Sequence, residues 1–322
     1  MPGLTIEEDG DSPCINEPTH VLSPPMVISD RLIGTLNDCG GTPTGREAVQ
    51  AMQAYLHSQG YELGEGIGRG WSSRVFKARD LFGRSLAIKI MRLKSLDGDS
   101  ASTYWDPQKG EALALGFQHE SICAPEKILY FGDGTIREQG RKGDLIVAII
   151  YLLVEGIGLD DYLSRGTISL GQVARFGIEI CGALQYVHSR DMIHGDLNLK
   201  NILITPKERP VLLDFGVARR VGTSPMPKSP KGAVMYASPQ RDQWGDAPYS
   251  PADDVYSLGM LLCRAYYGRF PSLRTQELPS PISNGLREKH FRDLISELFQ
   301  HAPDRRPTLE RVIQVLMALA DS

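Results

Sequence analysis

Two acidic residues and one amide stand beside short apolar runs in the second half of the chain. Asp196 and Asn201 lie in the segment HGDLNLKN, which the run ILI follows, and Asp214 comes directly after the run VLL. If these runs form strands, one base and two oxygen ligands would meet at their edges. Carboxylate and amide oxygens are the ligands that hard Mg²⁺ takes. The pattern therefore predicts transfer of a highly charged phosphoryl group, which needs both a base and such a metal.

A charged side chain also interrupts an apolar run in the first half of the chain. Lys89 stands in the sequence AIKI, where a buried ammonium group without an anionic partner would be costly. Glu111, in the predicted helix that follows, is a candidate partner, and the pair would fix the ammonium group against the phosphates of a nucleotide. Taken alone, Lys89 could equally lie on the solvent face of its strand.

A glycine-rich segment precedes Lys89 and contains Gly68 and Gly70. It lies between two predicted strands, whereas Rossmann and P-loop segments deliver phosphate to the start of a helix. A loop between strands could instead fold its backbone N–H groups over a nucleotide. Glycine-rich hairpins are common, so this segment does not decide the function by itself.

The elements that must position these residues begin with strands. Three strand-like segments occur between Tyr61 and Ile90, and two more lie in KILYFGDG and DLIVAIIYLLV, each bounded by glycine or charged residues. One helix is predicted to begin near Thr44 and end at Gly60, and another, in KGEALALGF, carries Glu111. We therefore expect an α+β fold with a five-stranded antiparallel first part.

The chain after Val154 is predicted to be mainly helical. One helical stripe consists of Val173, Phe176, Ile180, Leu184 and Val187. Two later segments, VYSLGMLLCRAYYG and LERVIQVLMALA, have the same period. The chain thus divides into an N-terminal tail at 1–43, a strand-rich part with a preceding helix at 44–154, and a helical part at 155–322.

Charge and composition restrict the partners. Residues 1–43 mix Pro, Gly, Ser and Asp without a sustained period, so a mobile tail is expected. Residues 1–45 carry seven acidic side chains and one basic side chain, which leaves a net charge of +2 on the other 277 residues. A nearly neutral body with an acidic tail has no attraction for a nucleic acid or an anionic bilayer. We expect neither as a partner.

Targeting signals are not evident in the sequence. There is no run of 18 apolar residues and no basic, then apolar, N-terminal leader. A cytoplasmic protein is the first expectation, and a bacterial effector that is exported through its acidic N-terminus and acts in a host cell is the alternative. The five cysteines are scattered and show no C-x-x-C spacing, which argues against a disulfide framework or a zinc site.

From about Tyr61 to Leu319 the chain resembles the eukaryotic-like, or Hanks-type, protein kinase family, and bacterial Ser/Thr protein kinases in particular. The resemblance rests on the segments above, which occur in the family's order, and on GAVMYASPQ, DVYSLG and RPT in the second half. It implies a bilobal fold, ATP and Mg²⁺ as cofactors, and a protein hydroxyl as the acceptor.

The resemblance also implies a role for each residue of the predicted site. Asp196 would orient the attacking hydroxyl as the catalytic base, and Lys89 would pair with Glu111 while it holds the phosphates. Asn201 and Asp214 would bind the metal.

The same resemblance implies an apolar slot for adenine, with Tyr151 at its rear and backbone groups around Leu153 pairing with the base. The residues placed around the nucleotide are Ile67, Gly68, Gly70, Val75, Ala87, Lys89, Tyr151, Leu153 and Leu203. Each apolar member of this set could equally be an ordinary core residue.

Three positions near the predicted base depart from the family. Gly195 replaces the arginine that normally gathers a phosphorylated activation loop, so we predict a non-RD kinase that loop phosphorylation does not switch on. Asn198 replaces a lysine typical of Ser/Thr kinases. Lys200 stands where tyrosine kinases keep an arginine, so it is a candidate for neutralising the γ-phosphate. Ser/Thr transfer is still favoured, because the rest of the chain resembles bacterial Ser/Thr kinases.

Two expectations concern packing. Gln240 replaces the glutamate that normally pairs with the arginine at Arg306, so Arg306 should find other acceptors nearby. Leu115 lies four residues after Glu111 on the same helical face. We expect it to continue the apolar stack through His194 and Phe215.

Two alternatives to an active protein kinase remain. A pseudokinase should lack at least one of Lys89, Asp196, Asn201 and Asp214, and all four are present. A small-molecule kinase resembling aminoglycoside or choline kinases would share the HGDxxxxN loop, but would not be expected to carry the later segments. The physiological substrate and the oligomeric state are not readable from the sequence.

Overall fold

The computed structural model describes residues 53–69, 73–93, 107–131, 145–224, 235–241, 247–272 and 277–320. The predicted tail at 1–43 and the predicted helix start at Thr44 lie outside the described residues. Helical backbone over 53–58 is followed by Gly60, whose φ of 84° is the left-handed conformation that ends a helix. No helix within the described ranges has the length and apolar character needed to span a membrane.

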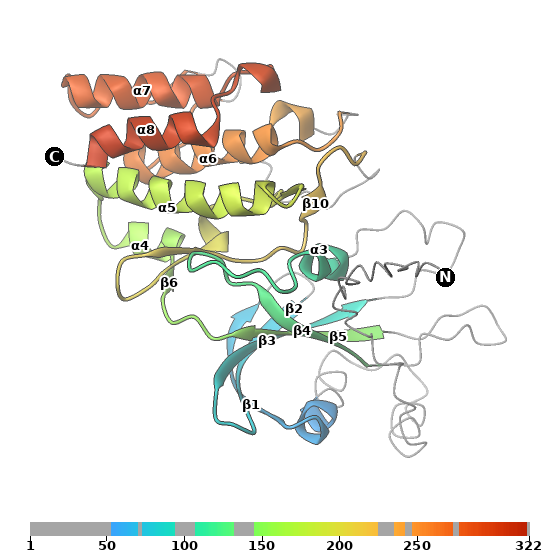
Figure 1. Cartoon of the computed structure of the whole chain (residues 1–322). Helices are drawn as coiled ribbons and strands as arrows, with labels where there is room; N and C mark the ends of the chain where they lie inside the picture. The colour runs from blue at the N-terminus through green and yellow to red at the C-terminus, as the bar shows by residue number, and fades with distance from the viewer. Residues whose placement is uncertain are drawn as a thin grey trace, which may run out of the picture. The chain divides into compact units, whose positions relative to one another are not determined.

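The predicted five-stranded antiparallel sheet is present (Figure 1). Its strands are β1 (Tyr61–Arg69), β2 (Ser73–Asp80), β3 (Ser85–Leu93), β4 (Pro125–Phe131) and β5 (Leu145–Leu152). They lie in the order β1-β2-β3-β5-β4, and each neighbouring pair is antiparallel. This sheet and the helices that follow it in the sequence confirm the α+β fold class.

Strand β3 carries Lys89 into an apolar part of the sheet. Lys89 lies opposite Ile149 of β5, and Met91 lies opposite Val147. Side chains alternate between the two faces of a strand, so Lys89 and Met91 share a face. Met91, Val147 and Ile149 form a buried cluster there, together with Tyr151. The Lys89 side chain is therefore largely removed from water.

The helix that carries Glu111 is short. Helix α3 (Pro107–Leu113) has seven residues and lies between β3 and β4 in the chain. It ends before Gly116, whose φ of 78° favours glycine. The predicted helical segment continued to Phe117, so the sequence overestimated the C-terminal extent of this helix.

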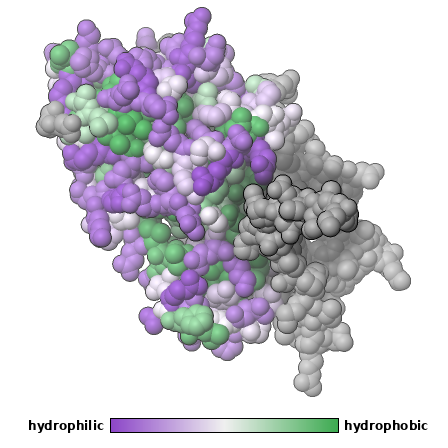
Figure 2. Space-filling model, viewed as in Figure 1, coloured by the Kyte–Doolittle hydropathy of each residue, from purple (hydrophilic) through white to green (hydrophobic). Residues whose placement is uncertain are grey.

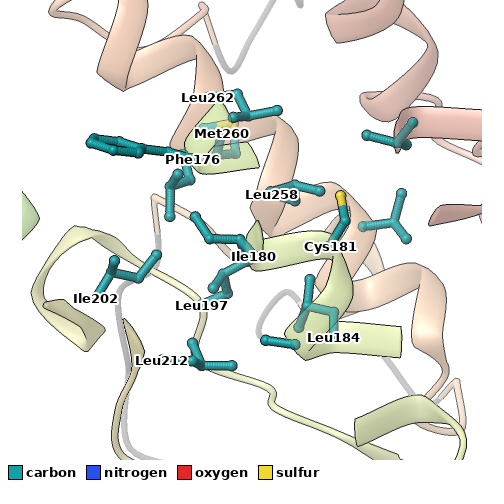
Figure 3. Close-up of a cluster of buried hydrophobic side chains, with 14 of the residues drawn as sticks. Phe176, Ile180, Cys181, Leu184, Leu197, Ile202, Leu212, Leu258, Met260 and Leu262 are labelled. Carbon is teal, nitrogen blue, oxygen red and sulfur yellow. The ribbon is translucent and has the colours of Figure 1, made fainter. Parts of the chain in front are cut away.

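The second half of the chain is helical, as predicted. Its helices are α4 (Leu159–Ser164), α5 (Leu170–His188), α6 (Pro251–Tyr267), α7 (Leu286–Leu298) and α8 (Leu309–Ala320). All five residues of the predicted stripe on α5 are buried, and Figure 3 shows Phe176, Ile180 and Leu184 of this stripe among core side chains from α6 and the short strands. Helix α7 was not predicted, because charged residues interrupt its apolar pattern.

Short strands and turns hold the loops between these helices. The strands are β6 (Ile157–Gly158), β7 (Met192–Ile193), β8 (Ile202–Ile204), β9 (Pro210–Leu212) and β10 (Arg219–Arg220), and the 3₁₀ turns are η2 (Leu199–Asn201), η3 (Pro239–Arg241) and η4 (Pro303–Arg305). Strand β9 also meets the segment before β4, because Leu212 N donates to Ser121 O and Cys123 N donates to Leu212 O, both at 2.9 Å. The residues just after β9 are thereby held close to the sheet.

The surface agrees with this partition of apolar residues. On the face seen in Figure 2, hydrophilic residues cover most of the described part, and hydrophobic residues appear in limited patches between them. Most of the apolar residues of α5 and α6 instead belong to the buried core.

Candidate active site

Lys89 lies between two carboxylates. Its Nζ is 3.0 Å from Glu111 Oε1 and 2.8 Å from Asp214 Oδ1. The Glu111 side chain is completely buried, whereas the Asp214 side chain is 45% exposed. Glu111 and Asp214 are 22 and 125 positions from Lys89 in the sequence. The structure thus brings together three residues that were predicted to belong to one site. One of the two carboxylates remains accessible to a ligand.

The charges of this cluster support one another. Burial lowers the pKa of Lys89, but the neighbouring Glu111 and Asp214 outweigh this effect and raise it above its ordinary value. Burial raises the pKa of Asp214, but the Lys89 ammonium group outweighs it and holds the pKa below the ordinary value. Burial raises the pKa of Glu111, and Lys89 offsets this only in part. Lys89 therefore stays charged, and Asp214 is the carboxylate that stays ionised most readily.

The loop that carries the predicted base is cross-linked by two amide side chains. Asn201 Nδ2 donates to Asp196 Oδ2 at 2.9 Å and to Asp196 O at 2.8 Å. Asn198 Nδ2 donates to Asp196 O at 3.0 Å, and Asn198 Oδ1 accepts from Lys200 N at 2.9 Å. Burial raises the pKa of the Asp196 carboxyl group above its ordinary value. Asn198 thus has a local structural task where the family's lysine would stand.

A buried carboxylate on α6 accepts hydrogen bonds from the backbone of the loop that carries Asp196. Asp254 accepts from the backbone N–H groups of His194 and Gly195, both at 2.9 Å, and its Oδ2 lies 2.8 Å from His188 Nε2. Asp254 begins the segment DVYSLG that resembles the kinase family, but the sequence pattern gave this residue no role in the site. An acidic residue among apolar residues of a predicted core helix was the signal that could have identified it.

The segment after β9 positions Asp214. Asn201 O accepts from Leu213 N at 2.8 Å, and Asp214 has a φ of 60°, a left-handed conformation that costs energy for a residue with a side chain. Gly216 N donates to Asp214 Oδ1 at 3.1 Å. The backbone at this point therefore holds the Asp214 carboxylate in one direction, toward Lys89.

Phe215 anchors the same segment in the core. Its ring is fully buried and lies 4.9 Å from the His194 ring and 5.7 Å from the Phe117 ring, both in edge-on arrangements. The expectation that Leu115 would continue this stack is wrong. Leu115 lies beyond the end of α3 and is exposed, and the turn at Gly116 brings Phe117 to Phe215 instead.

The residues predicted around adenine come from the five-stranded sheet, from the residue after β5 and from β8. Val75, Ala87 and Leu203 are half-buried, Ile67 is exposed, and Gly68 pairs with Val75 across β1 and β2. Gly70 lies outside the described residues.

Backbone hydrogen bonding refines the prediction for the base. Leu153 N donates to Ser85 O at 3.1 Å, so this N–H group belongs to the sheet and is not available to adenine. Neighbouring residues of a strand direct their N–H and C=O groups to opposite sides. The groups of Leu152, next to Leu153, therefore point away from β3, where Leu152 O accepts from Cys123 Sγ at 3.8 Å.

Tyr151, which was predicted to lie at the rear of the adenine slot, is close to Glu111. Its side chain is buried, and its hydroxyl group and Glu111 Oε2 are both buried without a hydrogen-bond partner among the described residues. Burial first, and then the nearby Glu111 carboxylate, raises the pKa of Tyr151 well above its ordinary value.

The donor set fits a hard cation. Within the described ranges, no recorded hydrogen bond uses Asn201 Oδ1 or Asp214 Oδ2, and both are the oxygen ligands that Mg²⁺ prefers. No group of three or more His, Cys, Asp or Glu side chains among the described residues forms a site on its own. A magnesium ion would therefore take its other ligands from water and from nucleotide phosphates, as it commonly does.

Lys200 is exposed next to this site. Its backbone N–H is bound by Asn198, and its ammonium group extends from the η2 turn at the surface. The contact of this group with a γ-phosphate stays a prediction.

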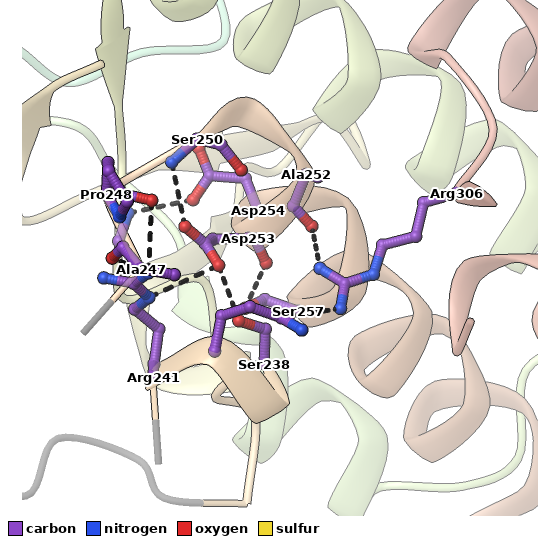
Figure 4. A network of polar contacts seen from close by, with 12 residues as sticks. Ser238, Arg241, Ala247, Pro248, Ser250, Ala252, Asp253, Asp254, Ser257 and Arg306 are labelled. Carbon is purple, nitrogen blue, oxygen red and sulfur yellow. Dashed lines mark hydrogen bonds and ion pairs between the residues drawn. The ribbon is translucent and has the colours of Figure 1, made fainter. Parts of the chain in front are cut away.

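Arg306 has the compensating acceptors that the sequence analysis expected. Its Nη2 donates to Gln240 Oε1 at 2.6 Å, and its guanidinium carbon lies 5.1 Å from the centre of the Tyr256 ring. The other acceptors are three main-chain carbonyl oxygens, those of Ala252, Gln300 and His301, at 2.7, 2.8 and 3.1 Å. Figure 4 shows Arg306 directed toward Ala252 at the start of α6.

Comparisons with known proteins agree with this geometry. The protein kinase domain family matches residues 61–316. A protein described as a probable serine/threonine-protein kinase from Corynebacterium efficiens is 34% identical over 66% of this chain and 31% of its own length. The serine/threonine-protein kinase PknA of Mycobacterium tuberculosis is 28% identical over 80% of this chain and 56% of its own length.

A human relative, NUAK family SNF1-like kinase 1, is 28% identical over 78% of this chain and 37% of its own length. The chain thus spans between about a third and a little over half of the length of these curated relatives. The family match covers the whole sheet, the residues of the candidate site and nearly all of the helical part. This chain belongs to the protein kinase domain family.

Proposed function

We propose that this chain is a protein serine/threonine kinase that transfers the γ-phosphoryl group of Mg-ATP to a protein hydroxyl group. The observation that carries the proposal is the convergence of Lys89, Glu111 and Asp214 within hydrogen-bond distance. The relatives named as serine/threonine-protein kinases support this acceptor class.

Each side chain of the site would perform one step of binding or proton transfer. Lys89, held by Glu111, would bind the phosphates, and Asn201 and Asp214 would hold the metal through their oxygens. Magnesium, when bound, neutralises charge on the transferred group. Because Lys89 contacts Asp214 directly, phosphates would replace Asp214 as its partner as the nucleotide enters.

Asp196 would take the proton of the acceptor hydroxyl. Asn201 binds Asp196 Oδ2, which fixes the carboxylate and leaves the other oxygen for the acceptor. A pKa raised by burial brings the base closer to the working pH, where a general base is more effective. The base therefore acts from a rigid loop that Asp254 supports through His194 and Gly195.

The test of this function is incorporation of radiolabelled phosphate from ATP. Asp196→Asn should abolish incorporation into a generic protein substrate, because the amide cannot accept the proton. Asp304→Asn, an exposed acid on η4, is the matched control and should retain it. Undiminished labelling by Asp196→Asn would remove the assignment of the base. Labelling of small hydroxyl compounds in place of proteins would favour a small-molecule kinase.

Regulation by activation-loop phosphorylation is not part of the proposed function. Gly195 supplies no cation beside the base, and Thr223, a candidate phosphosite, already donates its hydroxyl to Arg220 O at 2.7 Å. A phosphatase-treated preparation should therefore transfer phosphate at the untreated rate. Loss of activity that returns on rephosphorylation of residues 221–232 would contradict this. Phosphoamino-acid analysis of the product separates Ser/Thr from Tyr transfer.

A further inference from the structure

We propose that Gly110 is a positioning residue, whose missing side chain lets α3 approach the backbone of Phe215 and Gly216 and so aligns the two acids around Lys89. Gly110 directly precedes Glu111 in the chain, and Phe215 directly follows Asp214. The inference rests on the proposed kinase function and concerns how the site is held together.

The contact leaves no space for a side chain. A Cβ atom placed on Gly110 would lie 2.2 Å from Phe215 O, 2.7 Å from Gly216 O and 2.8 Å from Gly216 C. Non-bonded carbon atoms are at their optimal separation at about 3.5–4.0 Å. All three neighbours are backbone atoms, which cannot rotate away as the end of a side chain can. Either α3 or the Phe215–Gly216 backbone must therefore shift by roughly 1 Å to admit a methyl group.

Space, and not backbone freedom, is what the glycine provides. Gly110 lies inside α3, and it is not among the described residues with positive φ. Alanine would adopt this helical conformation more readily than glycine does. A substitution at this position therefore separates two effects that usually coincide, because it improves helix propensity while it prevents the close approach.

The helix is the element that would move. Phe215 is fully buried between the rings of His194 and Phe117, and the backbone at Asp214 is tied to the β8–β9 region through its neighbour Leu213. Helix α3 has only seven residues, and the residue after Glu111, Ala112, is exposed. An added methyl group would therefore displace α3 away from the anchored segment.

Displacement of α3 would break one half of the Lys89 arrangement. The Lys89–Glu111 contact is 3.0 Å, so a shift of roughly 1 Å away from the cleft would take it beyond hydrogen-bond distance. Lys89 would keep Asp214 at 2.8 Å but lose the partner that holds it in place when phosphates replace Asp214. The three atoms nearest to a Cβ on Gly110 all belong to Phe215 and Gly216, and none belongs to the strands of the predicted adenine pocket.

The test compares two glycine-to-alanine substitutions in helices of the full chain. Gly110→Ala should lower kcat for ATP-dependent labelling by about tenfold to a hundredfold, with a smaller change in the KM for ATP. It should also lower the melting temperature, because the buried Glu111 carboxylate loses Lys89. Gly182→Ala on α5 is the control, because a Cβ atom at Gly182 would have no neighbouring atom within 4 Å outside its own helix backbone. It should keep the wild-type kcat. Wild-type kcat in Gly110→Ala would overturn the inference, and so would a failure to fold.

A double-mutant cycle supplies the measurement that a general loss of stability would not produce. If Gly110 acts through Glu111, then Gly110→Ala combined with Glu111→Gln should be no less active than Glu111→Gln alone. Multiplication of the two losses would overturn the inference. An inactive wild-type protein would instead refute the proposed function, so the two failures are distinguishable.

Discussion

Two buried cations in this molecule have different kinds of hydrogen-bond partners. Lys89 contacts two carboxylates, one of which is partly exposed, whereas Arg306 contacts one amide and three main-chain carbonyl oxygens. The pKa of Lys89 is raised despite burial, because its acidic neighbours outweigh that burial. Burial lowers the pKa of Arg306, and nearby Asp253 offsets this only in part.

The difference separates a cation that exchanges partners from one that does not. A phosphate can replace the accessible Asp214 carboxylate at Lys89 without leaving the ammonium group unpaired. Three of the four acceptors of Arg306 belong to the backbone and cannot be exchanged without moving α6 or the segment before η4. Lys89 is thus suited to binding a ligand, and Arg306 to fixing the fold.

Removal of Lys89, the cation that can exchange partners, should produce the largest loss of activity. Lys89→Met should lower phosphate incorporation on the order of a hundredfold to a thousandfold, because a group that stabilises transferred charge is lost. Lys77→Met is the matched control, since Lys77 pairs with Glu65 on the exposed face of the same sheet. Steady-state assays with ATP measure both variants, and comparable activity of Lys89→Met and the control would contradict the comparison.

Removal of the fixed cation should instead affect stability. Arg306→Met leaves Gln240 Oε1 and the carbonyl oxygens of Ala252 and Gln300 without this donor, while His301 O keeps Gln240 Nε2. The free energy of unfolding should therefore fall by about 1–3 kcal/mol. Activity per folded molecule should not change, because none of the hydrogen-bond partners of Arg306 belongs to the candidate site. Chemical denaturation followed by an assay at low temperature measures both quantities. Full stability in this variant would mean that the carbonyl groups find other donors.

The pH dependence of Lys89→Met should identify Glu111 as a buried acid. Burial raises the pKa of Glu111 in the folded protein, so this carboxyl group stabilises the fold at low pH, and the contribution is lost as pH rises through the folded-state pKa. Without Lys89 no cation offsets the burial of Glu111, so the stability of Lys89→Met should fall as pH rises above the ordinary titration range of a glutamate. Unfolding curves of Lys89→Met and Lys89→Met/Glu111→Gln would show it, and equal pH dependence would refute it.

Restoration of the family's glutamate should have the smallest effect, and an unfavourable one. Gln240 donates from Nε2 to His301 O at 2.8 Å while its Oε1 accepts from Arg306. Gln240→Glu would replace that donor with a second acceptor facing a carbonyl oxygen, so it should lower stability by about 1 kcal/mol. Thermal unfolding at neutral pH tests the sign. An increase in melting temperature would show that the charge at Arg306 was insufficiently neutralised.

Much of the fold followed from local patterns. Short strand-like runs bounded by glycine or charged residues in the first half predicted the five strands, and the stripe from Val173 to Val187 predicted α5 and its buried face. The glycine at the end of the first described helix was also predicted correctly, because only a left-handed φ was needed there. Helix α7 was missed because its charged residues obscure the period.

Local patterns could not predict where a helix ends within a polar segment. The stack partner of Phe215 was assigned to Leu115 by counting four residues along a helix that in fact ends at Leu113. Phe117 takes the position because the turn at Gly116 redirects the chain. The error came from a boundary of a few residues, which changes the direction of every side chain after it.

By itself, the sequence determined which groups could do chemistry here: an amine, an amide and two acids, in a fixed order and in apolar or strand-edge contexts. Tertiary structure alone decided that Lys89 touches both Glu111 and Asp214, that backbone carbonyl oxygens accept hydrogen bonds from Arg306, and that Gly110 must lack a side chain. The reason is physical. Side-chain types are written in the sequence, whereas backbone carbonyls are the same at every residue, and only folding brings particular ones within reach.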